Sequence, residues 1–175
     1  MLMHKMRGFT IVELLIVIVV IAILATISVV TYSGIQTRAK NAQTVNAAAA
    51  WAKILKLYHA ETGSWPTVYS CLGTTATYQG NNGQCWDSTA WTVKPGFLGQ
   101  VQPYTGNYPE PDTTDTTAGT ANPSRRGLLY STDNSTYWIM YVFQIGSGTC
   151  PSIGLPLRAG PNNLGSGFHC VYNLV

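Results

Sequence analysis

The chain has 175 residues, of which 10% are charged and 46% hydrophobic, and its formal net charge is +3. This composition excludes a disordered chain, which would be highly charged and poor in apolar residues. It also argues against general nucleic-acid binding, because the ten basic residues are spread along the chain and form no basic stripe.

The apolar residues are concentrated near the N-terminus. From Leu14 to Val30, thirteen of seventeen residues are Leu, Ile or Val, and Ile11 and Val12 extend the run beyond Glu13. A membrane-spanning helix needs about 20 such residues. Their summed insertion free energy, roughly −4 to −8 kcal/mol, outweighs the cost of one carboxylate near the edge of the span. We therefore predict a membrane-spanning helix rather than a buried core helix, with an apolar surface made of Leu14, Leu15, Ile16, Val17, Ile18, Val19, Val20, Ile21, Ile23, Leu24 and Ile27.

A cleavable secretory signal peptide fits this segment poorly. His4, Lys5 and Arg7 supply a basic start, but the apolar core is longer than 7–15 residues and no small-residue cleavage site follows Val30. A signal anchor fits better, yet it leaves Glu13 unexplained, because a lone carboxylate among aliphatic residues is costly and is by default a functional hypothesis.

The segment KMRGFTIVELL, from Lys5 to Leu15, resembles the N-terminal signature of type IV pilins and the related pseudopilins. In that family a short basic leader ends in Gly, an aromatic residue often follows, and Glu is the fifth residue of the mature chain. The resemblance implies cleavage between Gly8 and Phe9 by a prepilin peptidase, followed by methylation of the new amine of Phe9. It also implies that Glu13 pairs with the Phe9 amine of a neighbouring subunit and so sets the register of assembly.

The resemblance also implies a function and a location. The chain is expected to be a structural subunit of a type IV pilus-like surface filament that serves adhesion, motility or DNA uptake. Before assembly it would be a single-pass protein of the cytoplasmic membrane with an extracytoplasmic head, and afterwards part of an extracellular pilus. The implied partners are identical and related pilin subunits, the prepilin peptidase and methyltransferase, an inner-membrane platform protein and an assembly ATPase. The alternatives are a pseudopilin of a type II secretion or competence system and, more distantly, a membrane-anchored extracellular enzyme.

After Val30 the pattern becomes amphipathic and predicts that the helix continues to His59. Apolar residues recur at three- and four-residue spacing, at Ile35, Ala39, Ala42, Val45, Ala49, Ala52 and Leu55. Gly63 and Pro66 favour a helix end soon afterwards, and residues 58–66 resemble the pilin helix exit. If the helix softens during assembly, residues 31–34 are the expected place.

The sequence predicts three parts of the chain: a leader at residues 1–8, a helix at 9–60 and a β-rich head at 61–175. The helix is expected to have a membrane half at about 9–32 and an amphipathic half at about 33–60.

The head is rich in Gly, Thr, Ser, Asn and aromatic residues. The run NSTYWIMYVFQ at residues 134–144 predicts a strand. Residues 127–131 precede this strand, and a turn is expected at Asp133-Asn134, so we predict that the two segments form a hairpin. Further strands are expected at residues 89–93 and 168–174, and a surface loop at 104–123. A long helix followed by antiparallel strands predicts an α+β, pilin-like fold in which the sheet is laid on the C-terminal half of the helix.

Four cysteines lie beyond the apolar segment and allow three disulfide connectivities. We favour Cys71–Cys85 and Cys150–Cys170 because each closes a short local loop. A zinc site is the rival interpretation, but C-x-x-C spacing is absent. The expected extracytoplasmic location favours disulfides, and the Cys150–Cys170 loop resembles the disulfide-bounded C-terminal region of many pilins.

The remaining candidate sites are weak. A calcium site is suggested by the acidic residues Glu110, Asp112 and Asp115, but they lack EF-hand spacing. We therefore expect a solvated loop there. We expect neither a metal nor another cofactor. Arg125-Arg126 is too small a cationic pair to support a nucleic-acid partner. Most Trp and Tyr residues of the head are expected in its core, with glycan binding as the alternative. There is no G-x-S-x-G, phosphate-binding glycine loop or H-E-x-x-H, so we expect no enzymatic activity.

Overall fold

The computed structural model describes residues 9–79, 84–86, 91–114, 125–133 and 137–174. The chain divides into two compact units, Met1–Arg38 and Ala39–Val175. Helix α1, Ile11–Thr62, has its first part in one unit and its second part in the other.

The first unit consists, in its described residues, of the start of α1 and the two residues before it. The aliphatic side chains between Ile11 and Ile27 are exposed, with fractions from 46% at Val17 to 80% at Ile11. By length and composition, α1 is able to cross a membrane. Such a continuous apolar surface is stable in lipid or against other apolar helices, but not in water.

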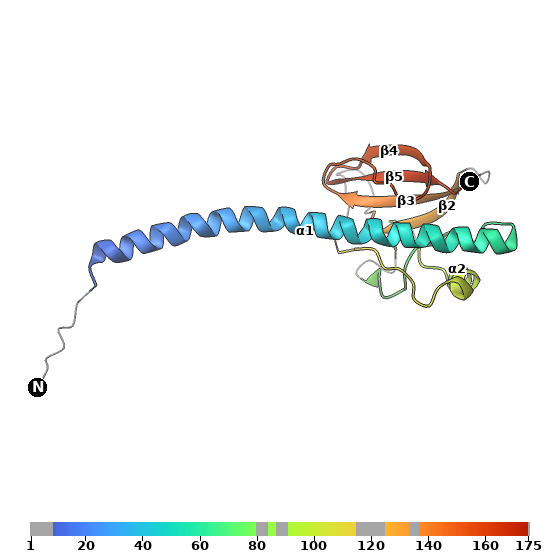
Figure 1. The fold of residues 1–175 in the computed structure, drawn as a ribbon, viewed down its shortest axis with the longest axis horizontal. Helices are drawn as coiled ribbons and strands as arrows, with labels where there is room; N and C mark the ends of the chain where they lie inside the picture. The colour runs from blue at the N-terminus through green and yellow to red at the C-terminus, as the bar shows by residue number, and fades with distance from the viewer. Residues whose placement is uncertain (1–8, 80–83, 87–90, 115–124, 134–136, 175) are drawn as a thin grey trace, which may run out of the picture. The chain divides into compact units, whose positions relative to one another are not determined.

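The second unit contains a five-stranded antiparallel sheet in the order β1-β2-β3-β5-β4 (Figure 1). Its strands are β1 Ser70–Cys71, β2 Leu128–Asp133, β3 Tyr137–Ile145, β4 Leu157–Asn163 and β5 Gly167–Asn173. Between β1 and β2 the chain forms the short helix α2, Pro95–Val101, and the 3-10 turn η2, Gln102–Tyr104. A long apolar N-terminal helix followed by an antiparallel sheet confirms the predicted α+β, pilin-like arrangement.

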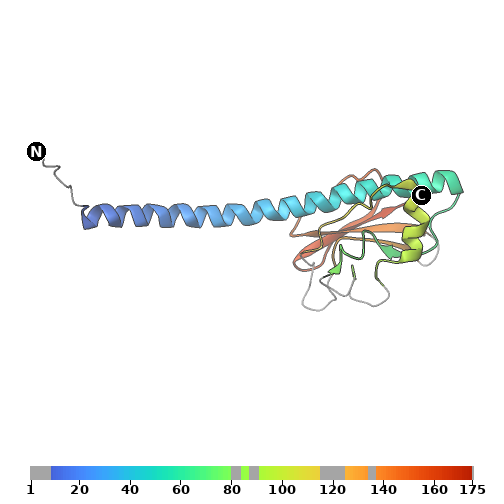
Figure 2. The same cartoon turned by 90° about the horizontal axis from the view of Figure 1, so that it is seen from below.

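The main core lies between the second part of α1 and one face of the sheet (Figure 2). Alternate strand residues point to this face, because side chains alternate across a strand. In register across the sheet they are Leu128, Val142 and Cys170 in one row, and Tyr130, Met140 and Tyr172 in the next.

The opposite face of the sheet is covered by the segment that follows β1. The disulfide Cys71–Cys85 and the ring of Tyr78 pack there against Leu129 and Phe143. The single Tyr78 hydroxyl proton is shared between the Leu72 and Leu128 carbonyls, at 3.0 and 3.2 Å, and the hydroxyl oxygen accepts from the Leu128 N–H at 3.2 Å. Burial raises the pKa of Tyr78, so the phenol stays neutral and serves as a structural donor. The head therefore has three layers: helix, sheet and a disulfide-bound segment.

The helix face that packs on the sheet agrees with the predicted stripe only in its second part. Of the predicted positions, Ala52 and Leu55 are buried and Val45 and Ala49 pack against the core, whereas Ile35, Ala39 and Ala42 are exposed. The buried face also contains Ala48 and Trp51, which the predicted stripe omitted. Trp51 has far more apolar surface than any alanine, so the face that buries it is favoured.

Several predicted element boundaries need correction. The hairpin of residues 127–131 and 134–144 is confirmed as β2 and β3, although β3 begins only at Tyr137 and its turn lies outside the described residues. The strand expected at residues 168–174 is confirmed as β5. The strand expected at residues 89–93 is wrong in its described part, where Thr92 forms only an isolated bridge with Gln84. Strand β4 and helix α2 were not predicted, because their sequences are rich in Gly and Pro.

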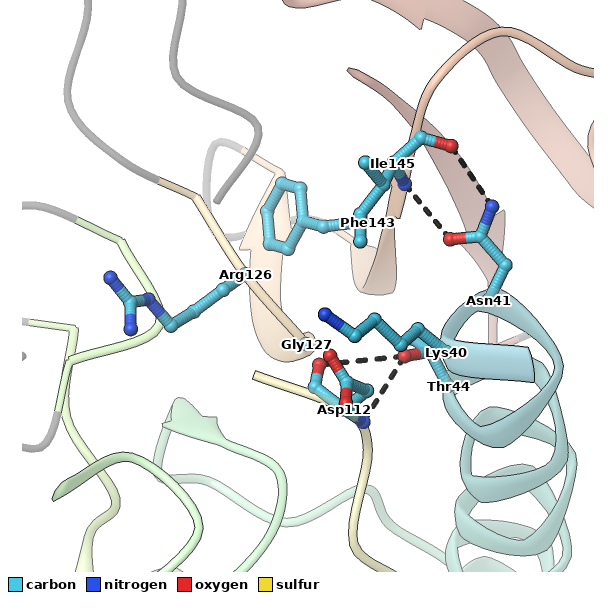
Figure 3. A pocket seen from close by; sticks show the side chains of 8 residues that line it. All are labelled: Lys40, Asn41, Thr44, Asp112, Arg126, Gly127, Phe143 and Ile145. Carbon is cyan, nitrogen blue, oxygen red and sulfur yellow. Dashed lines mark hydrogen bonds between the residues drawn. The ribbon is translucent and has the colours of Figure 1, made fainter. Parts of the chain in front are cut away.

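Asn41 links α1 to the end of β3 (Figure 3). Its Nδ2 donates to the Ile145 carbonyl at 2.9 Å, and its Oδ1 accepts from the Ile145 N–H at 2.9 Å. One turn later, the Thr44 hydroxyl accepts from the Asp112 N–H at 3.2 Å. These bonds surround a cavity of about 10 Å³, which has room for about one water molecule. Asn41 thus supplies both hydrogen-bond partners that the end of the central strand requires.

Replacement of Asn41 by alanine should destabilise the head by about 1–3 kcal/mol, because it leaves one N–H and one C=O of Ile145 without their partner. The measurement is the free energy of unfolding in urea of the full-length chain in detergent, followed by tryptophan fluorescence. Asn46→Ala is the matched control, since Asn46 is exposed on the same helix. Equal stability of the two variants would contradict a stabilising role for the Asn41 amide.

His169 gives the head a pH dependence with a definite sign. It is half-buried on β5 beside the Tyr141 and Phe143 rings, and its Nε2 lies 3.3 Å from Asn162 Nδ2. Burial, and secondarily the charge of Arg125, lower the pKa of His169 to about 4. Between pH 6.5 and 4 the unfolded chain therefore binds a proton that the folded chain does not, so stability falls as the pH falls through this window.

Substitution of His169 by glutamine should flatten this dependence. Unfolding free energies at pH 7, 5.5 and 4.5 are to be compared between wild type and His169→Gln, so that the carboxylates titrating in both proteins cancel in the difference. We expect the wild type to lose more stability than the variant on acidification. Parallel pH profiles would show that the imidazole has no such effect.

Candidate assembly site at the start of the apolar helix

The carboxylate predicted to govern assembly, Glu13, lies in the first turn of α1 and is held by Thr10. The Thr10 N–H and hydroxyl donate to Glu13 Oε2 at 2.9 and 2.7 Å. In return, the Thr10 hydroxyl accepts from the Glu13 N–H at 3.3 Å. Thr10 is thus the N-cap and Glu13 the third helical residue of a capping box.

The capping box places a negative charge at the end of the helix where it is most favourable. The unpaired N–H groups and the dipole of the first turn attract an anion. Glu13 nevertheless remains exposed, as does Phe9, whose exposed fraction is 76%. The carboxylate and the residue expected to carry the mature amine therefore lie at the same helix end, both accessible to another molecule.

Thr10 was missed by the sequence interpretation, although a signal for it was present. The pattern T-x-x-E immediately before an apolar run is the signature of a capping box. Gly8 and the rest of the leader lie outside the described residues, so cleavage before Phe9 and its methylation stay predictions.

The structure pairs Cys71 with Cys85 and Cys150 with Cys170, which are the two pairs favoured by loop length. The first attaches the segment after β1 to the outer face of the sheet, and the second attaches the loop before β4 to β5. Both disulfides contribute to cores of the head, with Cys71, Cys85 and Cys170 fully buried.

The acidic residues considered for calcium are engaged by protein donors. Glu110 Oε1 accepts from the Thr74 hydroxyl at 2.9 Å. Asp112 Oδ1 accepts from the N–H and hydroxyl of Thr114 at 3.2 and 2.9 Å. Asp115 lies outside the described residues, and within the described part of the chain no three His, Cys, Asp or Glu residues are grouped as a metal site would require.

The two adjacent arginines make contacts within the head. The Arg125 guanidinium lies over the Trp86 ring, 3.9 Å from its centroid. Arg126 donates through Nη1 to the Thr113 carbonyl at 3.2 Å. These contacts fit a structural role for the pair.

Comparison with known proteins agrees with the interpretation of the N-terminal segment. Residues 3–29 match the family model of the prokaryotic N-terminal methylation motif. Over 80 residues, the chain is 34% identical to the fimbrial protein EcpC of Eikenella corrodens, which amounts to 46% of this chain and 52% of that relative. The chain therefore spans about half the length of the curated relative that it matches. No solved structure matches the chain.

The motif match includes Phe9, Thr10 and Glu13, the residues that form the helix start described above. The chain thus resembles type IV pilins in its methylation motif, in its similarity to a fimbrial protein over 80 residues and in its helix-and-sheet fold.

Proposed function

We propose that the protein is a structural subunit of a type IV pilus-like surface filament, and that it polymerises through the first part of α1. The observation that carries the proposal is a helix whose aliphatic side chains are exposed from Ile11 to Ile27 and whose first turn holds a carboxylate, Glu13. A lipid bilayer before assembly and the apolar helices of other subunits afterwards would both cover this surface.

Assembly would begin with processing of the N-terminus. A prepilin peptidase would cleave between Gly8 and Phe9, and the new amine would be methylated, in keeping with the matched methylation motif. Before that step the helix would anchor the chain in the cytoplasmic membrane with the head outside. The platform protein and the assembly ATPase would then move the subunit from the membrane into the filament.

Glu13 would set the register of each added subunit. Once water and lipid are excluded, its carboxylate needs a positively charged partner, since an unpaired charge inside an apolar bundle is strongly destabilising. The mature α-amine at Phe9 of a neighbouring subunit supplies that partner. The Thr10 bonds would keep the carboxylate at the helix start until the amine arrives.

Electron microscopy of surface filaments tests the proposal. Deletion of the gene should remove the filaments or reduce their number and length, and complementation with the intact chain should restore them. Unchanged filaments in the deletion strain would contradict a principal structural role and favour a minor subunit or a pseudopilin instead.

A further inference from the structure

A second feature of the head lies at the C-terminal end of α1. A cavity of about 270 Å³ is lined there by Lys56, His59, Trp65 and Leu174. Lys56 and His59 are three residues apart and so belong to one face of the helix. Three segments of the chain therefore meet at this cavity: the last turns of α1, the residues after its end, and the C-terminal end of the sheet.

The end of α1 explains how the aromatic wall of the cavity forms. Gly63 adopts a φ of 70° and donates its N–H to the His59 carbonyl at 2.9 Å, which ends the helix and reverses the chain. The reversal lays the Trp65 ring on the His59 ring, with centroids 4.2 Å apart and planes inclined by 23°. The two rings form a stacked pair at the cavity.

The apolar part of the cavity is preformed. Leu174 is 2% exposed, and its N–H is bonded to the Trp138 carbonyl at 3.1 Å. Trp65 is half-buried and packs against the main core. Because these side chains are fixed by the fold, a ligand would bind there with little cost in side-chain ordering.

The charged part of the cavity is the Lys56 ammonium. Its Nζ donates to the Gly154 carbonyl at 2.6 Å, which orients the group, and an ammonium has three protons to donate. No carboxylate is among the described residues that line the cavity. The nearby acid of the last helical turn, Glu61, interacts with the Tyr104 hydroxyl instead. The cavity thus presents a cation beside an aromatic pair, a combination suited to an anionic ligand with an apolar face.

We propose that this cavity binds a pyranose that carries a carboxylate, such as a uronic or sialic acid residue of a surface glycan. The C–H face of a sugar ring packs on aromatic side chains, as the Trp65–His59 pair would allow, and the carboxylate pairs with the Lys56 ammonium. The volume lies just below the range of about 300–1,000 Å³ for drug-sized ligands, so the cavity suits one sugar residue rather than an oligosaccharide.

The test uses the full-length chain in a zwitterionic detergent, since detergents with sugar head groups would compete. Isothermal titration with sodium glucuronate and N-acetylneuraminate should give saturable binding with a Kd near the millimolar range. Methyl glucoside, which has the ring alone, and acetate, which has the carboxylate alone, should each bind several-fold more weakly. Preference for glucuronate would indicate uronate polymers as the source, and preference for N-acetylneuraminate would indicate sialylated glycans.

Two lysine variants distinguish binding in the cavity from a general attraction of the anionic sugar to lysines on the helix. Lys56→Gln should weaken glucuronate binding about fivefold and leave methyl glucoside binding unchanged. Lys53→Gln is the matched control on the same helix, exposed and outside the cavity lining, and should bind like the wild type. An unchanged unfolding midpoint in both variants shows that the head is intact.

Three results would each overturn the proposal. They are the absence of saturation by either acidic sugar, equal glucuronate affinity of the wild type and Lys56→Gln, and acetate binding as tight as that of glucuronate. None of them bears on filament formation, because the cavity belongs to the head and the experiment requires no assembly.

Discussion

Replacement of Glu13 by alanine should reduce the yield of surface filaments at least a hundredfold while leaving removal of the leader unchanged. Loss of one partner from a buried ion pair costs about 3–5 kcal/mol, and each 1.4 kcal/mol corresponds to a factor of ten in an equilibrium constant. The proposed cleavage between Gly8 and Phe9 would be spared because it would precede entry of the subunit into the filament. The measurements are the amount of the chain sheared from the cell surface and the mass of the membrane-bound pool.

Two controls separate pairing in the filament from capping of the helix. Thr10→Val removes the hydroxyl that bonds to Glu13 but keeps the carboxylate, and loss of an N-cap costs only about 0.5–2 kcal/mol. Glu61→Ala removes an exposed carboxylate from the last turn of the same helix. Both variants should form far more filaments than Glu13→Ala. Abundant filaments in Glu13→Ala would rule out the register role of this carboxylate.

The second large effect is expected at Trp51, where truncation to alanine should destabilise the head by about 3–5 kcal/mol. Trp51 is fully buried between α1 and the sheet, and its ring stacks on Tyr108 with centroids 6.0 Å apart. Its Nε1–H donates to the Pro109 carbonyl at 2.8 Å. Alanine would leave a cavity and an unpaired carbonyl in the same place.

Urea unfolding of the full-length chain in detergent, followed by near-ultraviolet circular dichroism, measures this loss. Trp51→Phe retains most of the apolar volume and should cost less than Trp51→Ala. Lys53→Ala, at an exposed position two residues later, should stay within about 0.5 kcal/mol of the wild type. A loss below about 1 kcal/mol for Trp51→Ala would show that the main core does not depend on this residue.

The elements with a strong local signal were predictable from the sequence. The apolar run after Glu13 is long enough to require a helix, and the β-branched and aromatic run that became β3 has strand composition over its whole length. The cysteine pairs followed from loop length, because each is joined over a short separation of 14 or 20 residues. Each of these features depends on residues that are close together in the sequence.

The features that escaped prediction depend on contacts between distant residues. Strand β4, LRAGPNN, has Gly and Pro in its interior and is exposed along its length, and it forms only because β5 pairs with it. The burial of Trp51, which the predicted stripe omitted, depends on its contacts with the loop at Tyr108 and Pro109, almost 60 residues later. The Asn41 bonds to Ile145 join residues 104 positions apart. Such pairings are determined by the assembled core, and no local pattern indicates them.

For the candidate assembly site, the sequence interpretation singled out Glu13 but missed Thr10 and the hydrogen bonds between the two. Glu13 stood out because a charge inside an apolar run is costly. The hydrogen bonds from Thr10 to Glu13 explain why a polar residue stands at position 10, which the composition of the segment does not explain. The cavity at Lys56 and Trp65 had no sequence signal, since it exists only where the helix exit folds back on the helix.

The most direct test of the filament-subunit proposal is the mass of this chain in material sheared from the cell surface. The proposal predicts a chain that lacks residues 1–8, begins with N-methylated Phe9 and retains the entire apolar helix. A sheared fraction without this chain, or a mature chain cut after Val30 so that the apolar segment is lost, would contradict polymerisation through that helix.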